Sequence, residues 1–162
     1  MLKRIFVTLC MVIALSLSAV AQTQDSSSIR NKMKALAEKY DEVNGIESLV
    51  CVKGSGLEMM KLMFRKEMGK DFIKGVDMII FINYADAPND LAKTIRGEVE
   101  GMAKDLREEE LPKDMTDGKY MRNFFSLSND EKEIHDMIIL VEEGDSKSVV
   151  YFGGVMKDDS DK

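Results

Sequence analysis

The chain has 162 residues, with 23 Lys or Arg against 29 Asp or Glu, so its net charge at neutral pH is −6. Basic and acidic residues are interspersed along the sequence, which disfavours nucleic acids and anionic lipid surfaces as ligands. Beyond residue 21, no apolar run is long enough to span a bilayer. The composition therefore excludes a membrane-embedded protein and a nucleic-acid-binding protein.

The first 21 residues have the pattern of a secretory signal peptide. Lys3 and Arg4 precede the apolar stretch IFVTLCMVIALSL, and the segment Ala19-Val20-Ala21 offers the small residues that signal peptidase requires. Cleavage after Ala21 leaves 141 residues and a net charge of −8. We expect a periplasmic or secreted protein with a polar leader at 22–28, a single domain at 29–156 and a charged tail at 157–162.

The first half of this domain has the pattern of three helices that alternate with two strands. Apolar residues recur every three or four positions in the segments 29–43, 57–69 and 88–106, which predicts amphipathic helices. The apolar runs 46–52 and 76–84 predict strands, and the second is apolar on both alternating faces, as a central strand should be. Cys51 would be the only cysteine of the exported chain, so no internal disulfide is expected, and its apolar strand predicts a buried thiol.

From Gly118 onward the pattern changes to three strand-like runs, 120–128, 135–143 and 148–156, separated by short polar turns. Such spacing is typical of an antiparallel meander. The helix-linked strands before it imply parallel pairing. The predicted fold class is therefore α+β in the order αβαβαβββ, a two-layer sandwich of a mixed five-stranded sheet with three helices mainly on one face.

This architecture leaves apolar strands without cover on their second face. Either a helix that returns across this face, another periplasmic protein or an identical subunit must shield it, and we expect a homodimer that buries roughly 1,200 Å² or more in total.

The segment GKYMRNFFSLSNDEKEIHDMIILVEEGDSKSVVYFGG resembles the C-terminal part of domain-of-unknown-function family 4252, small exported proteins of Gram-negative bacteria. The shared pattern consists of Phe124-Phe125, the strand from Ile134 to Val141, the Gly144-Asp145 turn and the strand from Val149 to Gly154. The strand VNGIESLVCV and the signal peptide extend the resemblance over most of the exported chain. The resemblance implies an exported location and this fold, and it carries over no catalytic residues because the family has no established activity.

The only histidine, His135, stands beside Asp136 at the start of a predicted strand. Adjacent strand residues point to opposite faces, so Asp136 should not orient the imidazole, and no second histidine is present to complete a metal site. We interpret the pair as a polar strand start. The acidic runs at 107–110, 142–145 and 158–161 lack the spacing of a calcium loop and are expected to be solvated turns and ends. No catalytic residue, metal or cofactor is predicted.

Two segments remain as binding candidates. Lys53, Gly54, Ser55 and Gly56 join a strand to a helix and would present backbone N–H groups to a small anion, although Ser55 could simply cap the helix. In the following helix, Leu57, Met60, Phe64 and Met68 share one side, and the apolar arc extends further through Met59, Leu62 and Met63.

That wide arc predicts either deeper burial or an interaction surface. The expected function is an exported, non-catalytic binding or assembly protein. The first alternative is a small-anion carrier or an enzyme that uses the Lys53–Gly56 turn. The second is a soft-metal chaperone that holds Cu(I) with methionine sulfurs at i and i+4.

Overall fold

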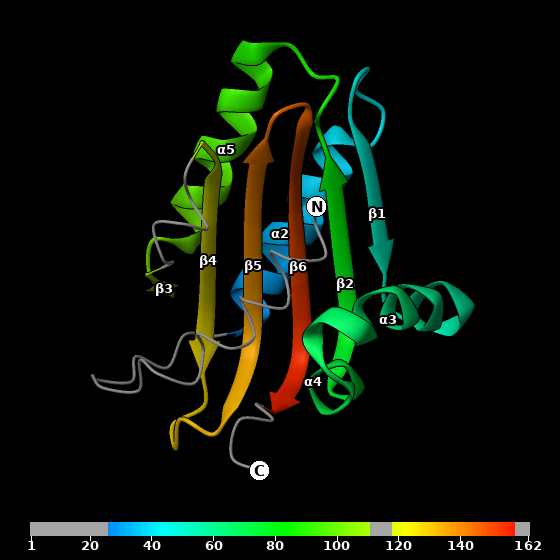
Figure 1. Ribbon diagram of the computed structural model, residues 1–162, viewed down its shortest axis with the longest axis vertical. Coiled ribbons are helices and arrows are strands. Elements are labelled where there is room, and N and C mark those ends of the chain that lie inside the picture. The colour runs from blue at the N-terminus through cyan, green and yellow to red at the C-terminus, as the bar shows by residue number, and fades with distance from the viewer. Residues whose placement is uncertain (1–25, 111–117, 158–162) are drawn as a thin grey trace.

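The computed structural model describes residues 26–110 and 118–157, which form one six-stranded antiparallel sheet with helices on both faces (Figure 1). The strand order is β1-β2-β6-β5-β4-β3. The elements in chain order are α2 (Ser26–Tyr40), β1 (Glu47–Cys51), α3 (Gly54–Met68), α4 (Lys70–Lys74), β2 (Val76–Asn83), α5 (Asn89–Ala103), β3 (Arg107–Glu109), β4 (Tyr120–Leu127), β5 (Glu133–Glu143) and β6 (Ser146–Lys157).

The predicted α+β class agrees with this structure, but the predicted five-stranded mixed sheet is wrong. The strands β1 and β2 pair antiparallel, although a helical segment connects them. Figure 1 shows the reason: α3 and the short α4 both lie at one end of these strands, so the chain enters β2 at the end where it left β1. A connection that does not cross the length of the sheet leaves the strands antiparallel.

The sixth strand is β3, which occupies part of the acidic run that was expected to be a solvated turn. Its three residues pair with β4, with Glu109 opposite Asn123. Glu109 is only 4% exposed and accepts a hydrogen bond from Asn123 Nδ2 at 2.8 Å. The run therefore contributes an edge strand and a buried carboxylate rather than a solvated loop.

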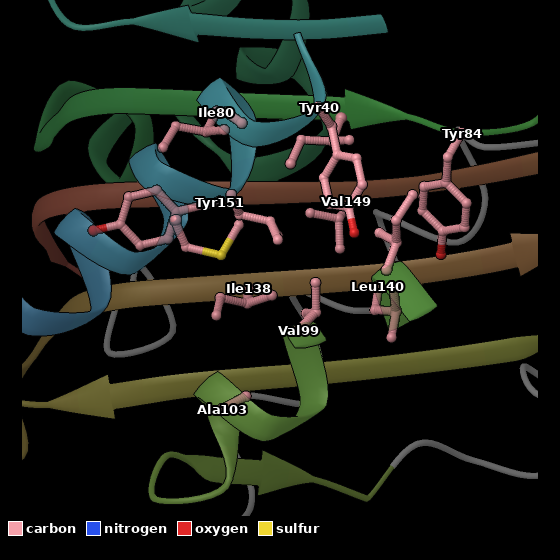
Figure 2. Close-up of a cluster of buried hydrophobic side chains, with 14 of the residues drawn as sticks. Tyr40, Ile80, Tyr84, Val99, Ala103, Ile138, Leu140, Val149 and Tyr151 are labelled. Atoms are coloured by element: carbon pink, nitrogen blue, oxygen red, sulfur yellow. The ribbon is translucent and has the colours of Figure 1, made fainter. Parts of the chain in front are cut away.

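The expected one-sided helix cover is also wrong, because the helices divide between the two faces of the sheet. The helices α2 and α5 cover one face, where their apolar side chains and those of β2, β5 and β6 form one core cluster (Figure 2). The helices α3 and α4 pack on the opposite face in a second cluster. The strand β2 supplies Ile80 and Ile82 to the first cluster and Ile79 to the second.

This division explains why β2 and β6 are apolar on both faces, since the cluster with α2 and α5 lies on one side of them and α3 and α4 lie on the other. On the second face, α3 and α4 lie beside β1, β2 and β6, and no described helix lies over β4 and β5 (Figure 1), so a second subunit stays a prediction. Within the part of the chain that the structure describes, no helix combines the length and the apolar character needed to cross a bilayer.

Candidate functional site

Helix α3 has a fully packed inner side. Leu57, Met60, Phe64 and Met68 are between 4% and 8% exposed and belong to the core cluster beneath α3 and α4. Phe64 meets the ring of Phe152 on β6 edge-to-face, with the ring centroids 5.1 Å apart. The predicted i, i+3, i+4 spacing of these residues thus marks the side of α3 that fixes it to the sheet.

The outer side of the same helix is also apolar. Met59, Leu62 and Met63 are 66%, 69% and 63% exposed, the highest values among the large exposed hydrophobic residues of the described chain. Their spacing of i, i+3 and i+4 places them together on one side of the helix. We call these three side chains the α3 ridge. Large apolar side chains grouped on the surface mark contact sites more often than isolated ones do.

A groove of about 260 Å³ lies between α3 and α4, beside the α3 ridge. Leu62 belongs to both features, because it is part of the ridge and also lines the groove. Four of the side chains that line the groove are cationic. The acidic side chain among them belongs to Glu58, whose Oε1 lies 3.7 Å from Lys61 Nζ. The lining residues are Glu58, Lys61, Leu62, Arg65, Lys70, Ile73 and Lys74.

The local charge of this region opposes that of the remaining chain. The segment 53–74 carries six basic and three acidic residues, a net charge of +3. The rest of the chain after Ala21 carries 15 basic and 26 acidic residues, a net charge of −11. The segment that forms α3 and α4 is therefore cationic within an acidic chain, a feature that whole-chain composition conceals.

The Lys53–Gly56 segment does not form the expected separate turn. Gly54, Ser55 and Gly56 are the first turn of α3, and Lys53 is its N-cap residue without a side-chain capping hydrogen bond. Ser55 therefore does not cap the helix. All four residues are exposed at the surface, and none of them lines the α3–α4 groove.

The structure separates His135 from Asp136, as strand geometry requires, but it buries the aspartate. His135 sits at a β-bulge, 34% exposed, with its Nε2 3.7 Å from Glu133 Oε2. Asp136 is 1% exposed and accepts hydrogen bonds from Tyr151 Oη at 2.6 Å and from Ser126 Oγ at 3.0 Å. Burial raises the pKa of the Asp136 carboxyl, while the two donors oppose that rise. The interpretation of the pair as a polar strand start is therefore wrong for Asp136, which is buried.

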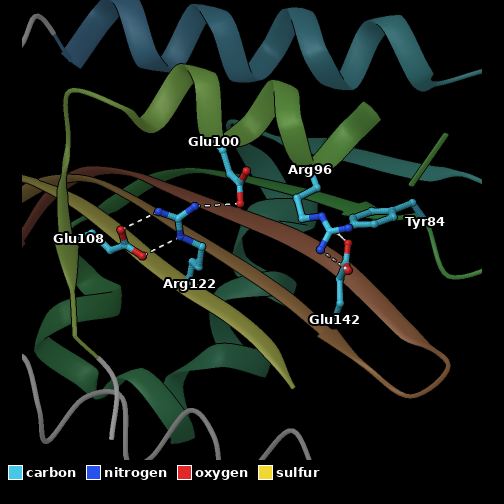
Figure 3. A network of polar contacts seen from close by, with 6 residues as sticks. All are labelled: Tyr84, Arg96, Glu100, Glu108, Arg122 and Glu142. Carbon is cyan, nitrogen blue, oxygen red and sulfur yellow. Dashed lines mark hydrogen bonds and ion pairs between the residues drawn. The ribbon is translucent and has the colours of Figure 1, made fainter. Parts of the chain in front are cut away.

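A second polar network joins α5 to the sheet (Figure 3). Glu142 accepts a hydrogen bond from Tyr84 Oη at 3.0 Å and lies 3.4 Å from Arg96. Arg122 binds Glu100 at 2.8 Å and Glu108 through two hydrogen bonds of 2.6 Å. Each charged group in this network already faces an opposite charge from another element, so the network fastens the helix to β4 and β5.

The four methionines of α3 do not converge. Met60 and Met68 lie in the core, whereas Met59 and Met63 point outward. Cys51, the cysteine of the described residues, is buried, and burial raises the pKa of its thiol. Among the described residues, no group of three or more His, Cys, Asp and Glu side chains could hold a metal ion. Of the four methionine sulfurs in α3, a Cu(I) ion at the surface could thus reach two, those of Met59 and Met63.

No protein-family model matches the chain, and no curated protein or solved structure is significantly similar to it. The resemblance to domain-of-unknown-function family 4252 therefore stays a prediction.

Proposed function

We propose that the protein is an exported, non-catalytic binding protein whose contact surface is the α3 ridge. The observation that carries this proposal is the roughly two-thirds exposure of Met59, Leu62 and Met63 on a helix whose opposite side is fully packed. Complete burial of one such side chain is worth about 1.5–3 kcal/mol. A partner that covers all three recovers much of this free energy, which the isolated molecule leaves unused.

The polar groups of the described chain support binding rather than catalysis. Asp136, whose carboxyl pKa is raised, is 1% exposed and already accepts hydrogen bonds from two side chains. Glu142 is held between Tyr84 and Arg96. A general acid or base must reach a substrate proton, and these carboxylates are committed to the packing of the fold.

Photo-crosslinking tests the proposal. A benzophenone amino acid in place of Leu62 is expected to give adducts with the bound partner, whether protein or lipid, when cells that export the protein are irradiated. The matched control is the same replacement at Lys93, an exposed position on α5. Intact-mass measurement detects both protein and lipid adducts. The proposal fails if position 62 gives no adduct, or if position 93 gives the same adducts in equal yield.

A second candidate function is the binding of a small anion in the α3–α4 groove, which Lys61, Arg65, Lys70 and Lys74 favour. In this hypothesis the anion binds in the α3–α4 groove and not at the exposed segment Lys53–Gly56 that the sequence suggested. It predicts affinity for inorganic phosphate that does not depend on the α3 ridge.

A further inference from the structure

We infer that the α3 ridge and the α3–α4 groove together dock the protein on the surface of a membrane that contains anionic phospholipids. This inference rests on the proposed function and names the partner of the same surface. It concerns binding to the membrane surface without any membrane-spanning element.

Apolar and cationic side chains lie next to each other on this surface. At about 100° per residue, Lys66 falls between Leu62 and Met59 around the helix, so a cation stands within the apolar ridge. Arg65 flanks Leu62 on the side of the groove, where Lys70 and Lys74 of α4 extend the cationic surface. A helix that lies in the headgroup region of a bilayer presents this combination, with apolar side chains at the acyl boundary and cations at the phosphates.

The uneven distribution of charge along the chain orients the molecule toward the membrane. The segment 53–74 carries a net charge of +3, and the rest of the chain after Ala21 carries −11. An anionic surface attracts the first part and repels the second, so the molecule approaches it with α3 and α4 in front. The even mixing of charges along the sequence argued against lipid, but that argument does not apply once folding places the two helices side by side.

A membrane fits the size and charge of this surface better than a protein partner does. A specific protein complex buries about 800 Å² on each partner, and three side chains of one helix supply only part of that area. A second copy bound through α3 would also bring two cationic ends together. A bilayer requires no matching shape and adapts to a narrow, protruding ridge, so the size and the charge of this surface both favour lipid.

Vesicle flotation tests the inference with protein purified from the periplasmic fraction of expressing cells. We expect the protein to float with vesicles of phosphatidylglycerol and phosphatidylcholine, and at least tenfold less with phosphatidylcholine alone. The triple variant Met59→Ser, Leu62→Ser, Met63→Ser and the double variant Lys70→Glu, Lys74→Glu should each weaken binding to anionic vesicles by about tenfold or more. Lys93→Glu on α5 is the matched charge control and should bind like the wild type, and circular dichroism checks that each variant is folded.

Three results would overturn the inference. Equal flotation with both kinds of vesicle would remove the role of charge. Binding of inorganic phosphate in the absence of vesicles, together with anionic-vesicle binding that the ridge variant does not change, would assign the groove to a small anion. Absence of flotation with either vesicle would exclude the membrane, and a protein adduct from position 62 in the crosslinking experiment would then preserve the proposed binding function with a protein partner.

Discussion

Replacement of Gly154 by alanine is expected to destabilise the protein by more than about 3 kcal/mol, because it combines backbone strain with a clash. Gly154 has φ of +142°, which L-residues rarely adopt, and a Cβ there would lie 2.1 Å from the carbonyl oxygen of Gly75. Val155 N–H donates to that same oxygen at 3.0 Å, so the two backbones are fixed against each other. The strain and the clash cannot be relieved by a rotating side chain.

Urea titration of two glycine variants measures this effect. Gly97→Ala is the matched control, since an added Cβ on this exposed position of α5 meets nothing within 4 Å and should raise stability by about 0.5–1 kcal/mol. A Gly154→Ala variant as stable as the wild type would show that β6 does not approach the end of α4 as described.

The second large effect is expected at Asp136. Asp136→Ala removes the acceptor of two buried hydroxyl groups, those of Tyr151 and Ser126, and should cost about 2–5 kcal/mol. Asp136→Asn keeps an oxygen for Tyr151 and should cost much less. His135→Gln, one position earlier at the bulge and partly exposed, is the matched control and should change stability by no more than about 0.5 kcal/mol. Chemical denaturation of the three variants at one pH gives these values.

The stability difference between the wild type and Asp136→Asn should also depend on pH. Burial raises the pKa of Asp136 in the folded protein above its ordinary value of 3.8, so folding favours the protonated carboxyl. The stabilising contribution of the protonated group is then complete below pH 3.8 and is lost as the pH rises through the folded-state pKa. As the pH rises from 3.8 through the folded-state pKa, the stability of Asp136→Asn should therefore increase relative to that of the wild type. A difference that stays constant, or that changes in the opposite direction, would show that the carboxyl pKa is not raised.

Much of the fold follows from local patterns in the sequence. The helical spacing of α2, α3 and α5 and the meander of β4, β5 and β6 agree with the structure because each depends on nearby residues. The sheet topology does not follow, since it depends on where the chain re-enters the sheet after α3. The short helix α4, with only five residues, leaves no periodic signal from which that return could be predicted.

The edge strand β3 illustrates a second limit. Its sequence, Arg-Glu-Glu, has low strand propensity, and it forms only because β4 offers it an edge to pair with. In contrast, the sequence pattern around Asp136 does indicate its burial. Asp136 shares its strand face with Ile138 and Leu140, and that alternation marks a core-facing position. The position of Asp136 on the same strand face as Ile138 and Leu140 was therefore a better indicator of its burial than its place beside His135.

The candidate surface was partly readable from sequence. The wide apolar arc of α3 allowed either deeper burial or a contact surface, and the structure places Met59, Leu62 and Met63 outside the core. The cationic groove could not be predicted, because it depends on the packing of Lys70 and Lys74 of α4 beside Lys61 and Arg65 of α3. Sequence spacing alone does not position two helices relative to each other.

Methionine methyl NMR tests most directly the central claim that α3 presents a free contact surface. The chain after Ala21 contains eleven methionines, and methyl-¹³C labelling gives each one a signal that single Met→Leu variants can assign. With a water-soluble gadolinium chelate added to the isolated protein, we predict strong broadening of Met59 and Met63 and sharp signals for Met60 and Met68. Equal protection of all four methyl groups would contradict the account, because the ridge would then already be covered in the isolated protein.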